Sequence, residues 1–325
     1  TYEVVAKNTL PVGDFYATPA ISDGMMFIRE RSKLYGIGGS AVTVSKTTSA
    51  REIDFEPSIT FFQLPEGTEL GPVSGAGTDD SGNIYLLQRQ APPVMCFDRT
   101  GKFLRSFGDE LVGTGHGLAV DPDNNVWVTD TGHHLVFKFS PEGKLLLALG
   151  ETDKPGDDEY HFNKPTHTAF GDNGDIFITD GYGNSRVVHV TADGKFVHAW
   201  GKAGAGPGEF NAPHAALIDK KGRLLICDRD NERIQIFNQQ GEFLDTWTGD
   251  KPFGVAMDND GTLFICGNNK VSQLEENGKI VRSWGEEGVE VGQFKTPHLL
   301  AADKDGNLYA AEVGGRRLQR LQRVR

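Results

Sequence analysis

Three histidines, His116, His214 and His298, each lie five residues ahead of an acidic turn that begins DPDN, DKKG or DKDG. Imidazole is a common zinc ligand, and a catalytic zinc ion keeps three protein ligands and one open position. A single histidine in such a place is most often structural. Three of nine in one register are hard to obtain by chance, so they are candidate ligands for one metal ion.

Two arginines and a tyrosine follow strand-like runs at equivalent points. Arg89 follows NIYLLQ, Tyr182 follows DIFITD and Arg229 follows RLLICD. Two guanidinium groups facing each other across a metal suit a small anionic ligand, because each offers a planar fork to a carboxylate. A phenol beside a metal and two cations loses its proton more readily and can act as a base. All three are candidate catalytic residues, and both arginines are candidate substrate-binding residues.

The elements that position these residues form an internal repeat. Six similar turns start at residues 79, 121, 171, 219, 258 and 303, and a strand precedes and follows each one. Four short strands in about 40–45 residues, repeated around an axis, form the blades of a β-propeller. We predict an all-β, six-bladed propeller as a single domain over residues 1–325. The N-terminal YEVV should supply the missing fourth strand and close the ring, and residues 14–58, with strand-like MMFIRE and AVTVS, form an insertion at the rim.

The first strand of each blade should line the central channel, which puts equivalent positions on one ring. Alternate blades of six lie about 120° apart, so histidines in blades 2, 4 and 6 should converge on the axis. Arg89 and Arg229 fall on opposite sides, and Tyr182 lies between them in ring order. The position five residues before each turn holds Ser74, His116, Thr166, His214, Phe253 and His298.

Other polar residues fall on the same face. His133 and His134 lie in the blade 2 loop and could line the mouth of the channel, and His167 follows the ring position of blade 3. His133 and His167 are candidate substrate contacts, although a spacer between blades is the alternative for His167. The acids that end three second strands, at Asp130, Asp180 and Asp228, are interpreted as structural acceptors of loop N–H groups.

Composition narrows the function classes. Net charge is −12 and no long basic block is present, which argues against nucleic-acid binding. No apolar run approaches the roughly 18 residues of a membrane span, so we expect a soluble chain. The chain begins at Thr1 without Met, and we leave open a processed, secreted or periplasmic protein and a cytoplasmic one. The three cysteines are expected to be free core thiols: Cys96, Cys227 and Cys266.

These motifs resemble a known family. HGLAVDPDNNVWVTDTGHHLVFKF, DGYGNSR, GEFNAPHAAL and LLICDRDNERIQIF are similar, in order and in register, to the NHL-repeat propeller of peptidyl-α-hydroxyglycine α-amidating lyases, over about residues 65–325. The resemblance implies zinc as cofactor, held by residues that match His116, His214 and His298. It implies a tyrosine base at Tyr182 and functional arginines at Arg89 and Arg229.

The implied substrate is a small α-hydroxy amide that carries a carboxylate. Cleavage of the C–N bond of an N-acyl or ureido α-hydroxyglycine would yield an amide and glyoxylate. The family also holds a structural calcium, whose backbone carbonyl ligands match Ala76 and Leu118. Its aspartate ligand matches Leu299. Carbonyl oxygens alone lack the charge that a hard cation needs, so we do not expect calcium here.

Two alternatives stay open. One is a metal-dependent lactonase or hydrolase on the same propeller, which would want carboxylates in the channel. The other is a non-catalytic NHL scaffold that binds a protein or RNA partner without a metal, although the acidic balance argues against RNA. The sequence identifies no protein partner.

Overall fold

The computed structural model describes residues 20–22, 25–30, 33–37 and 53–324, which belong to two compact units, residues 1–51 and 52–325. In the first unit three strands form one antiparallel sheet. The expected strand MMFIRE is one of them, whereas YEVV and AVTVS lie outside the described residues. The strands of this unit are β1 (Ala20–Ser22), β2 (Met25–Glu30) and β3 (Lys33–Ile37).

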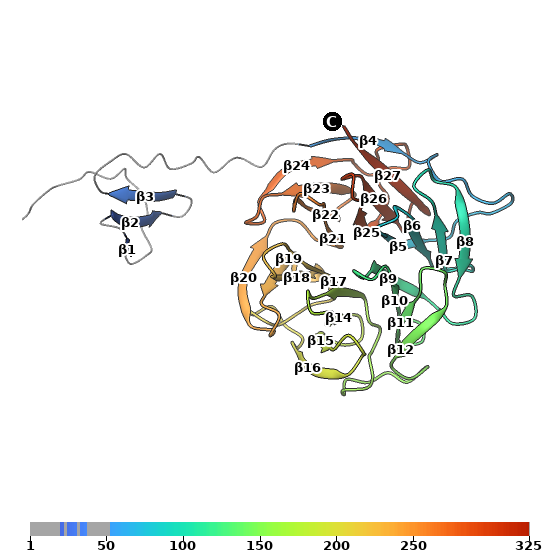
Figure 1. Ribbon diagram of the computed structural model, residues 1–325, viewed down its shortest axis with the longest axis horizontal. Coiled ribbons are helices and arrows are strands. Elements are labelled where there is room, and N and C mark those ends of the chain that lie inside the picture. The colour runs from blue at the N-terminus through green and yellow to red at the C-terminus, as the bar shows by residue number, and fades with distance from the viewer. Residues whose placement is uncertain (1–19, 23–24, 31–32, 38–52, 325) are drawn as a thin grey trace, which may run out of the picture. The chain divides into compact units, whose positions relative to one another are not determined.

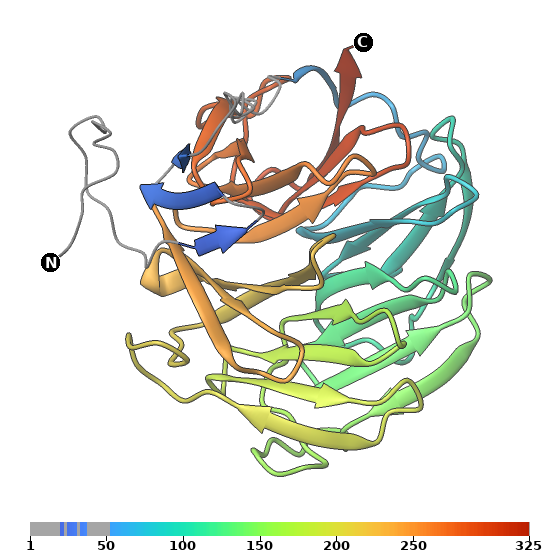
Figure 2. The same ribbon diagram turned by 60° about the vertical axis from the view of Figure 1, so that its left-hand side comes forward.

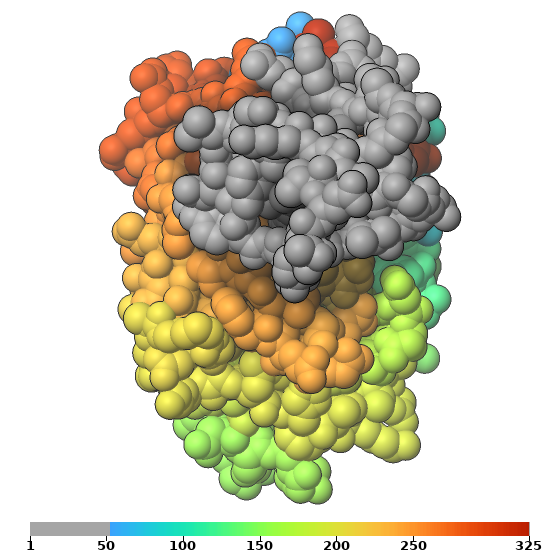
Figure 3. All heavy atoms as spheres, turned by 90° about the vertical axis from the view of Figure 1, so that its left-hand side faces the viewer, coloured from blue at the N-terminus to red at the C-terminus, as the bar shows by residue number. Residues whose placement is uncertain are grey.

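The second unit is a six-bladed propeller, as the repeats predicted. Each blade is a four-stranded antiparallel sheet of neighbouring strands, and the blades follow one another around a central axis (Figure 1). The turned view shows the twist of the sheets (Figure 2), and the space-filling view shows successive blades, yellow to orange, in direct contact (Figure 3). Blades 1 to 3 comprise β5 (Val73–Thr78), β6 (Ile84–Gln88), β7 (Val94–Phe97), β8 (Phe103–Phe107), β9 (Gly115–Val120), β10 (Val126–Asp130), β11 (Leu135–Phe139), β12 (Leu145–Leu149), β13 (His167–Phe170), β14 (Ile176–Asp180), β15 (Arg186–Val190) and β16 (Phe196–Trp200).

Blades 4 to 6 complete the ring. The first strand of blade 6 contacts the first strand of blade 1. The elements of these blades are β17 (Pro213–Ile218), β18 (Leu224–Asp228), the 3-10 turn η1 (Arg229–Asn231), β19 (Arg233–Phe237), β20 (Phe243–Thr248), β21 (Gly254–Met257), β22 (Leu263–Gly267), β23 (Lys270–Leu274), β24 (Ile280–Trp284), β25 (Pro297–Ala302), β26 (Leu308–Glu312), β27 (Arg317–Val324) and β4 (Asp54–Ser58).

The strand that closes the ring corrects the sequence prediction. The fourth strand of blade 6 is β4, whose residues pair antiparallel with β27, so YEVV does not fill this place. β4 falls within residues 14–58, so the end of that segment belongs to a blade. Its sequence DFEPS carries a proline, which is tolerated because an edge strand leaves one row of backbone groups unpaired.

The acidic turns between first and second strands are held by their leading carboxylate. Asp121 Oδ1 accepts hydrogen bonds from the N–H groups of Asp123, at 3.0 Å, and Asn125, at 2.8 Å. The residue two places before the second strand adopts a left-handed conformation, which favours glycine. Gly306 has φ 81° in blade 6, and Asn124 takes the same place in blade 2 with φ 66°.

Apolar side chains pack between the faces of neighbouring blades. Leu225 of blade 4 and Ile265 of blade 5 share one cluster, and Trp127 of blade 2 and Ile178 of blade 3 share another. All three cysteines are buried and free, as expected. In the described part of the chain the one helix is the three-residue turn η1, and no helix there is long and apolar enough to cross a membrane. The packed blades give the channel rigid walls on which side chains can be placed.

Candidate metal centre

The structure brings the three ring histidines together. His116, His214 and His298 are each the second residue of the first strand in blades 2, 4 and 6, and all three are buried. Their ring centroids are 4.6–4.7 Å apart in every pair. One nitrogen from each lies within 4.8 Å of the other two. These separations suit three ligands of one ion.

The backbone of the intervening blades fixes the tautomer of each imidazole. In every case Nδ1 lies within hydrogen-bond distance of the ring-position carbonyl in the next blade. A carbonyl only accepts, so Nδ1 carries the hydrogen and Nε2 keeps a bare lone pair. Such partners orient metal-binding histidines. The distances are 2.8 Å from His116 to Thr166, 2.5 Å from His214 to Phe253 and 2.7 Å from His298 to Ser74.

The Nε2 atoms are suited to a cation. His116 Nε2 is buried and has no hydrogen-bond partner in the described residues. Burial, with the neighbouring positive groups, holds the pKa of His116 and His214 well below the usual range and lowers the pKa of His298 to about 3. The imidazoles are therefore neutral near pH 7, as zinc ligation requires.

Tyr182 lies over this centre. It belongs to the loop after β14, and its hydroxyl is 3.1 Å from His214 Nε2 and 2.9 Å from Arg229 Nη1. Its ring also contacts the His116 ring, with centroids 4.7 Å apart. Since Arg229 donates to the phenol oxygen, the phenol hydrogen is directed to the His214 lone pair.

Arg229 is already paired. Its Nε and Nη2 atoms bind the Asp230 carboxylate at 3.0 and 2.8 Å, and Asp230 also pairs with Lys251 at 2.9 Å. Its guanidinium lies 5.2 Å from the ring centres of both Tyr182 and Phe253. Burial opposes its charge, but the Asp230 bonds hold the pKa of Arg229 above its usual value. Arg229 therefore has only Nη1 left, and Nη1 contacts Tyr182.

Arg89 has no such counter-ion. In the described part of the chain no carboxylate pairs with Arg89; its Nη2 lies 3.3 Å from His298 Nε2, and its Nε is buried without a hydrogen-bond partner. Burial lowers the pKa of Arg89. A partly buried cation without an anion is costly, and an anionic ligand would offset that cost. The two arginines, equivalent in the sequence, therefore differ in the structure.

The remaining sequence candidates make no hydrogen bond to this centre, although His167 is near enough to help lower the pKa of His116 and of His298. His133 pairs with Asp153 at 2.7 Å, which raises the pKa of His133, and the imidazole of His134 accepts the Lys164 N–H at 3.1 Å. His167 is buried on β13, which lowers its pKa to about 4. Among the described residues, none of these hydrogen bonds reaches the triad, Tyr182 or either arginine.

The carbonyl positions matched to calcium have other neighbours. The Leu118 backbone makes a hydrogen bond with His167. Leu299 is buried in the apolar cluster between blades 4 and 5, so its position offers no charge. Ala76 is buried on β5.

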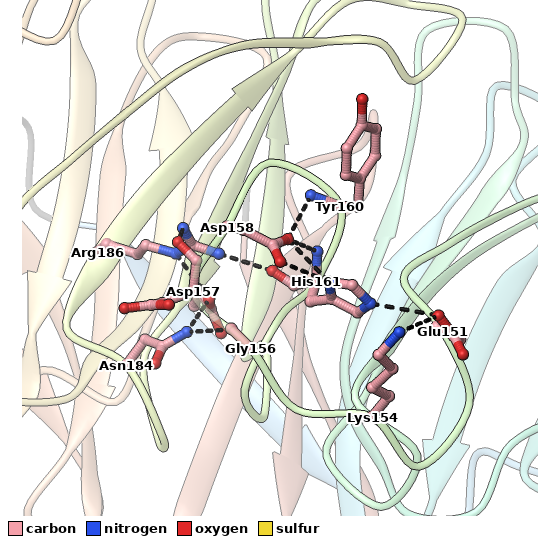
Figure 4. A network of polar contacts seen from close by, with 10 residues as sticks. Glu151, Lys154, Gly156, Asp157, Asp158, Tyr160, His161, Asn184 and Arg186 are labelled. Carbon is pink, nitrogen blue, oxygen red and sulfur yellow. Dashed lines mark hydrogen bonds and ion pairs between the residues drawn. The ribbon is translucent and has the colours of Figure 1, made fainter.

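Salt bridges at the ends of the second strands hold the loops above the centre. Asp180 accepts from Arg186 Nε at 3.0 Å and from the Asn163 N–H at 2.8 Å. Figure 4 shows Arg186 beside His161, whose carbonyl accepts a hydrogen bond from Arg186 Nη2. The same figure shows His161 between Asp158 and Glu151. Blades 4 and 6 repeat the acid–arginine pair, with Asp228–Arg233 and Glu312–Arg317. The acids are structural acceptors of loop N–H groups: Asp130 accepts the Gly132 N–H of the following loop at 2.8 Å and the Thr114 N–H of the loop ahead of the first strand at 2.8 Å. Asp180 and Asp228 accept backbone N–H groups from the loop ahead.

The sequence did not reveal the roles of two supporting residues. Asp230, which neutralises Arg229, directly follows it in CDRDNER, and an acid next to a candidate arginine was the available signal. Phe253 was placed on the ring, but its packing against Arg229 has no sequence signature.

The fold is a six-bladed β-propeller, and its buried histidine cluster is a candidate metal site. Family models match an NHL repeat over residues 116–139 and a 6-bladed β-propeller over residues 156–282. NHL repeat-containing protein 3 from Homo sapiens is 33% identical over 264 residues, which cover 74% of this chain and 76% of that protein. The chain belongs to the family of NHL-repeat six-bladed β-propellers.

Lyases are among the other relatives. Peptidyl-α-hydroxyglycine α-amidating lyase 1 from Drosophila melanogaster is 32% identical over 289 residues, which cover 77% of this chain and 53% of that protein. In solved structures, a streptogramin B lyase is 19% identical with a TM-score of 0.62, over 83% of this chain and 98% of that one. A gluconolactonase from Xanthomonas campestris is 14% identical with a TM-score of 0.61, and the match covers 79% of this chain and 87% of that one. At such identities these two structures show the fold alone.

Proposed function

We propose that this protein is a zinc-dependent lyase that cleaves the C–N bond of an N-acyl or ureido α-hydroxyglycine and releases an amide and glyoxylate. The observation that carries the proposal is the convergence of three neutral imidazoles, with the Tyr182 hydroxyl 3.1 Å from one Nε2 atom. The reaction class comes from the names of the Drosophila relatives, of which this chain spans only 53% and 62%.

The Nε2 atoms of His116, His214 and His298 would hold the ion. Zinc bound there would act as a Lewis acid toward the substrate oxygens. Tyr182 and Arg89 now donate to the Nε2 atoms of His214 and His298. Once those lone pairs are used for ligation, both donors are free to contact substrate.

Arg89 is suited to bind the substrate carboxylate. It carries a charge that no carboxylate of the described residues neutralises, and its Nε lacks a partner. A guanidinium fork binds a carboxylate through two parallel hydrogen bonds. This contact would fix the hydroxyl-bearing carbon relative to Tyr182.

Tyr182 is suited to move the proton. As a phenolate it would take the proton of the substrate hydroxyl; the oxygen electron pair forms the carbonyl of glyoxylate as the C–N bond breaks. The leaving amide nitrogen would take up the proton that Tyr182 removed, so Tyr182 is regenerated and the products are a neutral amide and glyoxylate. Arg229 acts through Tyr182, because its Nη1 holds the phenol oxygen at 2.9 Å while Asp230 occupies its other nitrogens.

The competing functions require different groups at the centre. A lactonase or hydrolase would want a carboxylate at the ring, and the six ring positions carry none. Asp230, which directly follows Arg229, is paired with Arg229 and Lys251. A non-catalytic scaffold would need neither bound zinc nor an unpaired Arg89.

Glyoxylate release tests the proposal. Zinc-loaded protein should convert α-hydroxyhippurate to benzamide and glyoxylate in equal amounts, and protein stripped by a chelator should not. Zinc-loaded protein that hydrolyses lactones but releases no glyoxylate would favour the hydrolase. A protein without either activity that takes up no zinc would favour the binding scaffold.

A further inference from the structure

His134 belongs to the loop of blade 2 that joins β10 to β11, and it holds a loop of the next blade. Its backbone is left-handed, with φ 60°, and its Nδ1 atom accepts the N–H of Lys164 at 3.1 Å. A backbone N–H only donates, so Nδ1 is the bare nitrogen of the ring. Lys164 is 30 residues further along the chain, ahead of the first strand of blade 3. The contact therefore ties one blade to the entry of the next.

Lys164 is bonded in turn to the loop of the proposed base. Its carbonyl accepts the Tyr182 N–H at 3.3 Å, and the carbonyl of Asn163 accepts the Gly183 N–H at 2.8 Å. These two bonds join the loop ahead of β13 to the loop that carries Tyr182. Lys164 is itself left-handed, with φ 61°, a conformation that residues with a Cβ atom seldom adopt. The His134 contact thus stabilises the backbone shape that presents the Lys164 carbonyl to Tyr182.

Blade 5 contains a second instance of this contact with a different side chain. Asn269 lies directly before β23, as His134 lies directly before β11, and it is also left-handed, with φ 57°. Its Oδ1 atom accepts the N–H of Thr296 at 3.0 Å. Thr296 takes the place of Lys164: it is left-handed, with φ 53°, it precedes a proline, and its carbonyl accepts the Val313 N–H at 3.1 Å. The recurrence indicates a built tether in which an asparagine oxygen can replace the imidazole Nδ1 atom.

We propose that His134 is a positioning residue for the Tyr182 base, an inference that rests on the proposed function. The Tyr182 hydroxyl lies 3.1 Å from His214 Nε2 and 2.9 Å from Arg229 Nη1, so a small shift of its loop would carry it away from the centre. Displacement of a reacting group by about 1 Å can cost about 10²-fold in rate. His134 fixes Lys164, and Lys164 fixes the backbone of Tyr182.

Two substitutions separate the acceptor from the backbone conformation. Glycine and asparagine both tolerate a left-handed backbone, but only asparagine carries an acceptor, as Asn269 does in blade 5. In His134→Gly, kcat for glyoxylate release from α-hydroxyhippurate should fall about tenfold, with KM unchanged because Arg89 is untouched. His134→Asn should keep kcat near the wild-type value.

Residue-resolved hydrogen exchange tests the tether without substrate. In His134→Gly the amides of Lys164 and Tyr182 should exchange about 2- to 12-fold faster than in the wild type, which is the factor for the loss of one ordinary hydrogen bond. His134→Asn should keep both rates. Asn124→Gly is the matched control, because Asn124 is also left-handed but lies in the turn at the other end of β10. It should change neither the two exchange rates nor kcat.

A cooperative urea transition in each variant establishes that it is folded. A wild-type protein that releases no glyoxylate would refute the proposed function, and the exchange rates would then decide alone whether the tether exists. Equal exchange of Lys164 and Tyr182 in every variant overturns the proposal. An active wild type whose kcat is unchanged in His134→Gly also overturns it, as does a loss of kcat that His134→Asn shares, because the acceptor would then be irrelevant.

Discussion

Replacement of Arg89 by methionine should weaken substrate binding. The long apolar side chain keeps most of the volume and removes the charged fork. A hydrogen bond to a charged group contributes about 1.5–3 kcal/mol. Since about 1.4 kcal/mol corresponds to a factor of ten, kcat/KM for α-hydroxyhippurate should fall about 10- to 150-fold, mainly through a higher KM. Initial rates of glyoxylate release over a range of substrate concentrations measure this change.

The same substitution should leave the substrate-free fold at least as stable. Arg89 has a buried Nε without a partner and no carboxylate beside it in the described residues. An unsatisfied buried polar group costs about 1–3 kcal/mol, so Arg89→Met should hold or raise the free energy of unfolding. Urea denaturation of the metal-free protein at pH 7 measures it.

Arg229→Met is the matched control. Its guanidinium binds Asp230 through two nitrogens and Tyr182 through the third. Its loss should lower kcat, and it should reduce the free energy of unfolding by about 1–2 kcal/mol. The argument that the two arginines differ is refuted if Arg89→Met destabilises the fold as much as Arg229→Met and leaves KM unchanged.

Three further predictions follow from other contacts. Tyr182→Phe removes the proposed base, so kcat should fall by about 10²–10⁴ while bound zinc is unchanged; full activity would remove Tyr182 from the reaction. Burial lowers the pKa of His167 from 6.5 to about 4, so between these pH values only the unfolded chain gains the proton, and the free energy of unfolding falls as the pH drops from 6.5 to 4. Urea denaturation at several pH values should therefore show that His167→Gln removes roughly 3 kcal/mol of this pH dependence. A pH profile that is unchanged in the variant would contradict the prediction. Arg233→Met leaves the buried Asp228 without its cation and should cost about 3 kcal/mol of unfolding free energy, whereas Lys202→Met, in an exposed pair, should cost under about 0.5 kcal/mol.

Much of the site followed from the register of the repeats. His116, His214 and His298 could be placed at one height because a propeller repeats its geometry every blade, so equal spacing to a turn means equal place on the ring. The same alignment put Ser74, Thr166 and Phe253 between them. The alignment could not reveal that the backbone carbonyls of these three residues orient the imidazoles, because every residue type has the same backbone carbonyl.

The failures have equally local causes. YEVV has a stronger strand pattern than DFEPS, yet β4 closes the ring, because strand propensity depends on packing context and does not by itself select which segment pairs. Arg89 and Arg229 looked equivalent in the sequence because the alignment of the repeats shows where a residue lies on the ring but not which side chains pair with it. One neighbour, Asp230, separates their roles.

Zinc analysis of the purified protein tests the central claim most directly. After dialysis against a weak chelator that strips exchangeable ions, the wild-type chain should retain one zinc ion. His214→Ala should retain none, whereas His198→Gln, outside the ring centre, should retain one. A wild-type chain that takes up no zinc, or a folded His214→Ala variant that still holds it, would contradict a metal centre built by the three ring histidines.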